Sequence, residues 1–93
     1  MEKKEQKFEI KATDETIKGI YANNAMIMHT KNEFLIDFMS ILPPRGTLGA
    51  RIIMSPNTIK RIAKALNENI ARYESQNGEI KIAEEPNLQQ FTH

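Results

Sequence analysis

One Ser-Pro pair, Ser55-Pro56, divides this chain into a half that favours strands and a half that favours a helix. Before the pair, residues 20–29, 33–41 and 48–54 are rich in branched, aromatic and methionine side chains, which is typical of strands. After it, apolar side chains recur at spacings of three and four and form one helical stripe: Ile59, Ile62, Ala63, Leu66, Ile70 and Tyr73. Ser55 suits an N-cap, and Asn77-Gly78 is a good helix stop.

This order of elements predicts an α+β fold. We expect a three- to four-stranded antiparallel meander followed by one long C-terminal amphipathic helix. Residues 7–11 and residues 79–82 are the candidates for an additional short strand, residues 13–16 are typical of a turn, and Pro43-Pro44 ends the second main strand. The predicted organisation is a charged N-terminal segment over residues 1–18, a single α+β domain over 19–82, and a tail over 83–93.

The hairpin break near Lys31-Asn32 and one charge pair predict the strand register. Pairing across the break sets Met28 opposite Leu35 and Ile27 opposite Ile36. We place Asp37 opposite Arg51, because an opposite-charge pair is favourable and a slip of one residue turns every side chain to the other face. This pair is interpreted as structural, with a binding role as the alternative.

The predicted register gives the sheet two apolar faces. The hydrocarbon face carries Ala25, Ile27, Phe34, Ile36, Phe38, Ala50, Ile52 and Met54. The Met-rich face carries Ile20, Met26, Met28, Leu35, Asp37, Met39, Ile41, Arg51 and Ile53. One helix covers only one face, so we expect the helix on the hydrocarbon face and a partner subunit on the Met-rich face. Its self-association or partner-binding residues are Met26, Met28, Leu35, Met39 and Ile53.

Length and composition narrow the class of protein. Ninety-three residues make one small domain that buries a modest core, for which association with other subunits is a common remedy. The chain has no cysteine, its N-terminus lacks the apolar region of a signal peptide, and no apolar run approaches the roughly 18–20 residues of a membrane span. We therefore expect a cytoplasmic homo-oligomer that does not enter a membrane.

No residue pattern indicates catalysis, a cofactor or a metal. His29 and His93 are the only histidines, and neither has further ligands at a suitable spacing. Asn23 and Asn24 are unusual in a strand and are candidates to bond a bulge, an edge or a neighbouring chain. The lowest-ranked hypothesis is an enzyme with an interfacial site around Tyr21, Asn23, Asp37 and Arg51, although these residues include no nucleophile–base pair.

Basic residues gather on one side of the predicted helix: Lys60, Arg61, Lys64 and Arg72. Residues 19–78 hold seven Lys or Arg against four acidic residues, a net charge of +3. Such a charge is weak for a dedicated nucleic-acid binder, and such a run is more often a solvated face. Nucleic-acid contact through these residues is the alternative function.

Several short motifs follow one another over residues 19–80: Gly19-x-Tyr21-Ala22-Asn23, Glu33-Phe34-x-x-Asp37-Phe38, Pro43, Arg51-Ile52-x-x-Ser55-Pro56, Lys60-Arg61, Leu66, Tyr73-Glu74 and Gly78-x-Ile80. Their order and spacing resemble a family of small prokaryotic proteins of unknown function. The resemblance implies no activity, cofactor or site residue. A more remote fold-level likeness is to the secretion chaperone SecB, which also places an antiparallel sheet before a long helix.

The features together favour a non-enzymatic, oligomeric binding or adaptor module. Its working surface is expected to be the Met-rich face or the loop around Pro43-Pro44-Arg45. A SecB-like chaperone role is one form of this hypothesis. The alternative from a different class is a nucleic-acid-associated regulatory protein that uses the basic side of the helix.

Overall fold

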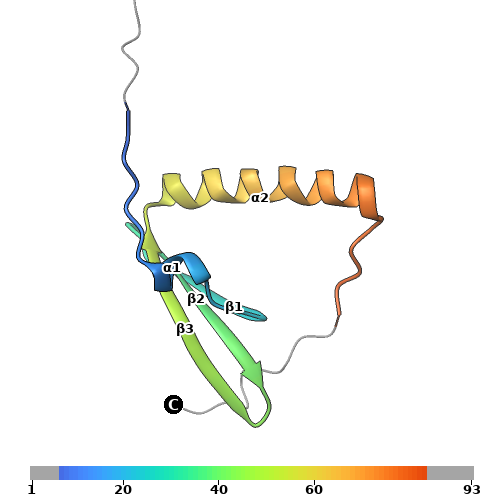
Figure 1. Cartoon of the computed structure of the whole chain (residues 1–93), viewed down its shortest axis with the longest axis horizontal. Coiled ribbons are helices and arrows are strands. Elements are labelled where there is room, and N and C mark those ends of the chain that lie inside the picture. The colour runs from blue at the N-terminus through green and yellow to red at the C-terminus, as the bar shows by residue number, and fades with distance from the viewer. Residues whose placement is uncertain (1–6, 84–93) are drawn as a thin grey trace, which may run out of the picture.

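The computed structural model describes residues 7–83, and the chain forms five elements there. These are α1 (Asp14–Lys18), β1 (Asn24–His29), β2 (Phe34–Leu42), β3 (Arg45–Met54) and α2 (Pro56–Asn77). The strands form one antiparallel sheet in the order β1-β2-β3, and α2 follows the last strand (Figure 1). The predicted α+β fold, a meander followed by a long helix, is confirmed.

The observed register agrees with the predicted one. Asp37 lies opposite Arg51, Ile36 lies opposite Ile52, and Met28 lies opposite Leu35. Beyond Phe38 the pairing of β2 with β3 shifts, so that Phe38 faces Ala50 while Met39 faces Leu48. Gly49 is the extra residue of this β-bulge, a position at which a residue without a side chain is common.

The bulge also brings the chain before β1 close to β3. A Cβ atom added to Gly49 would lie 2.9 Å from Cδ1 of Ile20, closer than ordinary van der Waals contact. The end of the Ile20 side chain therefore lies against the backbone of β3 at Gly49. A shallow groove between α1 and β3 follows from this approach, and it is lined by Glu15, Thr16, Gly19, Ile20, Gly49 and Ala50.

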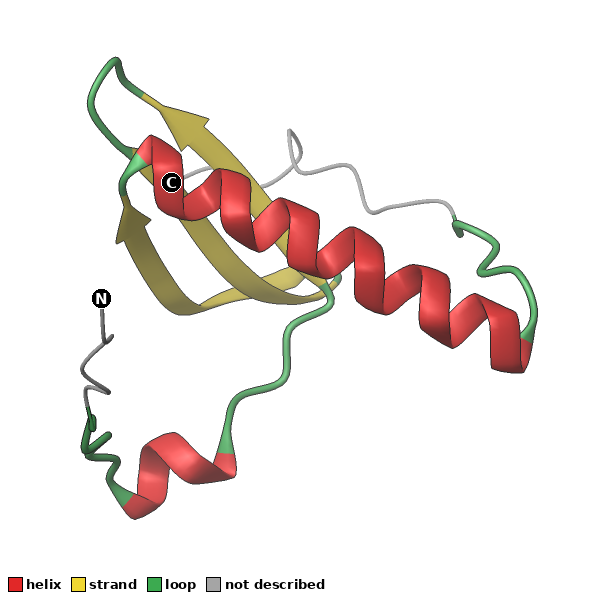
Figure 2. Ribbon diagram, turned by 90° about the horizontal axis from the view of Figure 1, so that it is seen from above, coloured by secondary structure: helices red, strands yellow, loops and turns green. Residues whose placement is uncertain are grey.

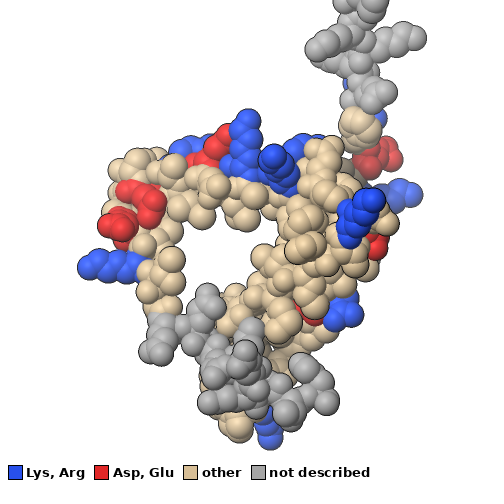
Figure 3. Space-filling view, turned by 180° about the vertical axis from the view of Figure 1, so that it is seen from behind, with Lys and Arg blue, Asp and Glu red and all other residues tan. Residues whose placement is uncertain are grey.

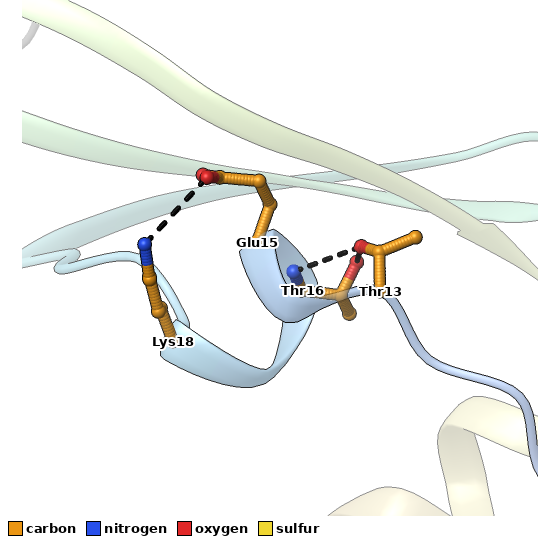
Figure 4. Close-up of polar contacts among 4 residues, drawn as sticks. All are labelled: Thr13, Glu15, Thr16 and Lys18. Atoms are coloured by element: carbon orange, nitrogen blue, oxygen red, sulfur yellow. Dashed lines mark hydrogen bonds and ion pairs between the residues drawn. The ribbon is translucent and has the colours of Figure 1, made fainter.

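Two details of the N-terminal segment differ from the predictions. Residues 7–11 form no strand, and the stretch read as a turn over 13–16 begins a short helix instead. Thr13 caps α1 by accepting a hydrogen bond from the Thr16 amide at 3.1 Å, and Lys18 pairs with Glu15 at 3.7 Å (Figure 4). Residues 1–6 lie outside the described part of the chain.

The C-terminal segment differs as well. Residues 79–82 form no strand, so the sheet has three strands and not four within residues 7–83. Gly78 ends α2 at a φ of 89°, and its amide donates to the Glu74 carbonyl at 2.9 Å. The Ile80 amide donates to the Glu74 carboxylate at 2.9 Å, which holds this segment against the helix end. Most of the predicted tail, residues 84–93, lies outside the described residues.

The start of α2 is fixed as the sequence predicts. The Ser55 hydroxyl accepts a hydrogen bond from the Thr58 amide at 3.2 Å, and Pro56 occupies the first turn. Ser55 is also the whole connection between β3 and α2. The direction of α2 is therefore set by the end of β3 and not by a flexible loop.

In the single chain, α2 does not cover the hydrocarbon face as predicted. Figures 1 and 2 show α2 leaving the end of β3 and extending beyond the sheet. On the sheet, Ile27 is 60% exposed and Ile52 is 44% exposed; on the helix, Leu66 is 57% exposed and Tyr73 is 53% exposed. The radius of gyration, 17.2 Å, exceeds the roughly 13 Å of a compact 100-residue domain.

The core of the described chain is correspondingly small. Ile36 and Ile41, which are 8% and 3% exposed, are the buried apolar residues among those described. No residue of α2 is buried. Since hydrophobic burial is the main favourable term in folding, one copy leaves much of its apolar surface unused.

Candidate functional site

A charge pair lies at the centre of the Met-rich face. Arg51 donates two hydrogen bonds to the Asp37 carboxylate, from Nε to Oδ1 at 2.7 Å and from Nη2 to Oδ2 at 2.8 Å. Asp37 is only 7% exposed, whereas about half of the Arg51 side chain remains open to solvent. This forked geometry satisfies the carboxylate and leaves one side of the guanidinium accessible.

The pair changes the acidity of both groups. The hydrogen bond from Arg51 and its positive charge hold the pKa of Asp37 below its ordinary value of 3.8, although desolvation opposes the change. The same hydrogen bond raises the pKa of Arg51. Both groups are therefore charged at neutral pH.

We expect a pH dependence of stability from Asp37. A carboxyl whose pKa is lower in the folded state stabilises that state fully above its ordinary pKa. The contribution should be complete well above pH 3.8 and should be lost as the pH falls through the lower folded-state pKa. Urea unfolding at a series of pH values checks this, with Asp37→Asn as the variant that should lose that component of the acid dependence. An unchanged acid dependence in Asp37→Asn would contradict the assignment.

The register brings the predicted Met-rich residues together. Met28, Leu35 and Ile53 form one cross-strand row, and Met26 extends the row of Asp37 and Arg51. Three of these side chains are substantially open: Met26 is 38% exposed, Met28 is 42% exposed and Ile53 is 56% exposed. The arrangement is that of an apolar surface around a partly accessible charge. Whether this surface binds a partner or a second copy stays a prediction.

One member of this face was missed. Leu48 pairs with Met39, which in turn pairs with Asn24, so it lies on the Met-rich face and is 52% exposed. Continuous pairing would place Leu48 on the opposite face. Gly49 inside a strand pattern is the signal that could have indicated the bulge.

Asn23 has a structural role at the edge of the sheet. Its side-chain amide donates to the Ile41 carbonyl at 2.9 Å, and its side-chain oxygen accepts from the Ile41 amide at 2.8 Å. Its own amide donates to the Met39 carbonyl at 3.0 Å. Asn23 thus continues the pairing of β2 beyond the start of β1. The neighbouring Asn24 has a buried side-chain nitrogen with no hydrogen-bond partner in the described residues.

The four residues of the enzyme hypothesis have separate contacts within the described part of the chain. Asp37 and Arg51 bond each other, Asn23 bonds Ile41, and Tyr21 is 76% exposed. None of the four lines the groove between α1 and β3. Asp37 and Arg51 thus supply a paired charge on the Met-rich face.

The histidine that lies in the described part of the chain has a packing contact. His29 stacks on Phe34 with ring centroids 5.3 Å apart. No group of three His, Cys, Asp or Glu residues able to hold a metal ion was found within residues 7–83. His93 lies outside those residues.

All four basic residues of the predicted nucleic-acid contact lie on α2, and all are exposed: Lys60, Arg61, Lys64 and Arg72. Figure 3 shows Lys and Arg side chains along the side of α2 that faces away from the sheet. By their spacing, the residues of the apolar stripe lie on the other side of the helix. The basic residues and the apolar stripe of α2 therefore lie on different sides of the helix.

These features define an α+β protein with an open three-stranded sheet and a projecting amphipathic helix. The chain belongs to the family described as "Protein of unknown function (DUF3467)", whose model matches residues 1–82. The predicted resemblance to a family of unknown function is thereby confirmed. No match was found among curated proteins or solved structures, so the likeness to SecB stays a prediction. Of the helices in the described residues, none is long and apolar enough to cross a membrane.

Proposed function

We propose that this protein is a non-enzymatic, oligomeric binding module whose Met-rich face holds a partner protein. The observation that carries the proposal is the open row Met28, Leu35 and Ile53 beside the Asp37–Arg51 pair. Methionine and leucine side chains adapt to irregular apolar surfaces, and methionine is common where a surface binds several partners. An exposed arginine within such a surface supplies a directional contact.

Charge distribution supports a protein partner with an apolar contact segment and an acidic group. The Asp37 carboxylate is satisfied by Arg51, so burying this face leaves no unpaired carboxylate. The exposed side of Arg51 retains donors for a carboxylate from the partner. Chaperone-like binding of apolar segments is the form of this function that the surface suits best.

Ile53→Asp tests the proposal, with Ile10→Asp as the matched control. Both side chains are exposed, at 56% and 91%, but Ile10 lies outside the sheet. We expect Ile53→Asp to lose the companion protein that the wild-type chain retains when purified from its own host, because the new carboxylate replaces an apolar contact and competes for the open donors of Arg51 on the same face. Ile10→Asp should retain it.

The complex should then be rebuilt from purified components, and its affinity measured for each variant. We expect Ile53→Asp to weaken binding by at least about tenfold, which corresponds to about 1.4 kcal/mol. Equal affinities of Ile53→Asp and the wild-type chain would contradict the assignment of this face. Circular dichroism of each variant controls for loss of the fold.

The basic side of α2 supports a second candidate, contact with nucleic acid. Its observation is the row of Lys and Arg side chains on the outer side of the helix (Figure 3). Such binding would weaken steeply with added salt because phosphate contacts release counterions. Titrating a labelled single strand and a duplex at low and moderate salt tests it. Absence of binding even at low salt would remove this candidate, and retention of affinity in Lys60→Gln/Lys64→Gln would show that α2 is not the contact.

A further inference from the structure

We propose that the apolar stripe of α2 is covered by α2 of a second copy of this chain. The two helices would pack antiparallel about a two-fold axis near Leu66, and the C-terminal half of each would reach the partner's hydrocarbon face. This inference rests on the proposed function only in that both require an oligomer. The proposal assigns the self-association surface to the helix side of the sheet and leaves the Met-rich face free.

The connection between β3 and α2 is the first argument. Ser55 alone joins the two elements, and its hydroxyl and carbonyl are both used to begin the helix, by Thr58 and Ile59. The helix would need a longer loop to turn back over its own strands. Its 22 residues therefore extend over about 33 Å and pass beyond the sheet (Figure 2).

The second argument is that the uncovered surfaces match. The stripe consists of Ile59, Ile62, Ala63, Leu66, Ile70 and Tyr73, and none of these residues is charged. Ile27, Ile36 and Ile52 cross the hydrocarbon face as one row, with His29 at one edge and Arg45, opposite Leu42, at the hairpin end. Joining the stripe to the row at Ile27, Ile36 and Ile52 leaves Arg45 at the rim, so no lysine, arginine or carboxylate must lose its water.

The third argument comes from the arrangement of charge and space. Figure 3 shows an opening between α2 and the sheet, which the segment after α2 also borders, while Lys and Arg side chains lie along the outer side of the helix. In the proposed dimer the stripe of the second α2 faces the stripe of the first, and the basic side of each helix stays in water. Antiparallel pairing also separates the basic residues of the two copies, which lie away from the stripe on both helices.

Symmetry and size favour a second copy over an unrelated partner. A two-fold interface uses the same patch on both subunits, so each exposed stripe is covered by the other at once. A stable interface takes about 20–30 residues from each partner. The six residues of the α2 stripe and the eight residues of the hydrocarbon face would form the apolar centre of such an interface.

The first test is native mass, measured on the full chain at several concentrations. We expect the wild-type chain and Ala71→Asp to have twice the mass of one chain, and Leu66→Asp to have the mass of one chain. Leu66 lies at the centre of the stripe, while Ala71 lies on the opposite side of α2 and is also exposed. A folded wild-type chain with the mass of one copy at all concentrations would overturn the proposal.

Because a chain that cannot pair would also lose the stability that pairing provides, two single-cysteine variants supply a second test. The natural chain has no cysteine, so Leu66→Cys and Ala71→Cys each introduce a single thiol. Under mild oxidation we expect Leu66→Cys to form a disulfide between copies rapidly, because the two-fold axis brings the two thiols together. Ala71→Cys should form far less. Equal crosslinking of both variants would contradict the antiparallel arrangement.

The outcomes separate this proposal from the proposed function. If Ile53→Asp reduces the native mass while Leu66→Asp does not, copies associate through the Met-rich face and the helix proposal is wrong. If Leu66→Asp reduces the mass and Ile53→Asp loses only a companion protein, both hold. A disulfide between Leu66→Cys and an unrelated protein, in place of one between two copies, would also overturn the helix pairing.

Discussion

Ile41→Ala is expected to destabilise the fold by about 2–5 kcal/mol, because it removes most of a buried apolar side chain. Ile41 is 3% exposed, the most buried apolar residue of the described chain. Truncating the Ile41 side chain leaves a cavity beside its backbone, which the Asn23 side chain holds by two hydrogen bonds. Urea unfolding measures the difference in the free energy of unfolding.

The adjacent residue provides the control for Ile41→Ala. Leu42 belongs to the same strand but is 78% exposed, so Leu42→Ala should change stability by no more than about 0.5 kcal/mol. Similar losses for the two variants would show that Ile41 is not part of a packed core.

Asn23→Ala should have the second large effect, a loss of about 2–4 kcal/mol. The change removes both hydrogen bonds between the Asn23 side chain and the Ile41 backbone. The part-buried amide and carbonyl of Ile41 are then left without these partners. Hydrogen exchange at the Ile41 amide should accelerate in the same variant. The rate of exchange at this amide locates the loss, which a global stability measurement does not.

Asn24→Ala is the matched comparison for Asn23. The buried side-chain nitrogen of Asn24 has no partner in the described residues, so removing it should cost little or stabilise the fold. A loss in Asn24→Ala as large as that in Asn23→Ala would contradict the division of roles between the two residues.

The strand register could be predicted from sequence because two independent constraints agree. A slip of the pairing by one residue would turn every side chain of a strand to the opposite face of the sheet. The Asp37–Arg51 pair then selects one register among the possible pairings of β2 with β3. The caps of α2 were predictable for a similar reason, since Ser55, Pro56 and Gly78 each satisfy a local requirement of a helix end.

Features that depend on distant contacts were harder to predict. The alternation at Ile80 and Ile82 favours a strand, but a strand also needs the edge of a sheet to pair with. In the structure this segment pairs with no strand of the described sheet. Asn23 was identified as unusual in a strand, yet its partner Ile41 is 18 positions away and only the fold brings them together. The helix α1 was missed even though Thr13 and the acidic residues after it fit an N-cap.

The candidate site shows the same division. Met26, Met28, Leu35, Met39 and Ile53 could be assigned to one face because the register determines that face. Leu48 could not, because the bulge at Gly49 changes the alternation. The α2 stripe could be recognised as a surface that needs a partner, but a helical pattern contains no information about which surface covers it.

The concentration dependence of thermal unfolding tests the central claim, that one copy is an incomplete folding unit, most directly. Association of folded chains stabilises them by mass action, so the unfolding midpoint should rise with protein concentration when helix content is followed. Ala71→Asp should show the same rise, and Leu66→Asp should lose it. A midpoint independent of concentration, with α2 helical throughout, would contradict the account because a single chain would then stabilise its exposed helix alone.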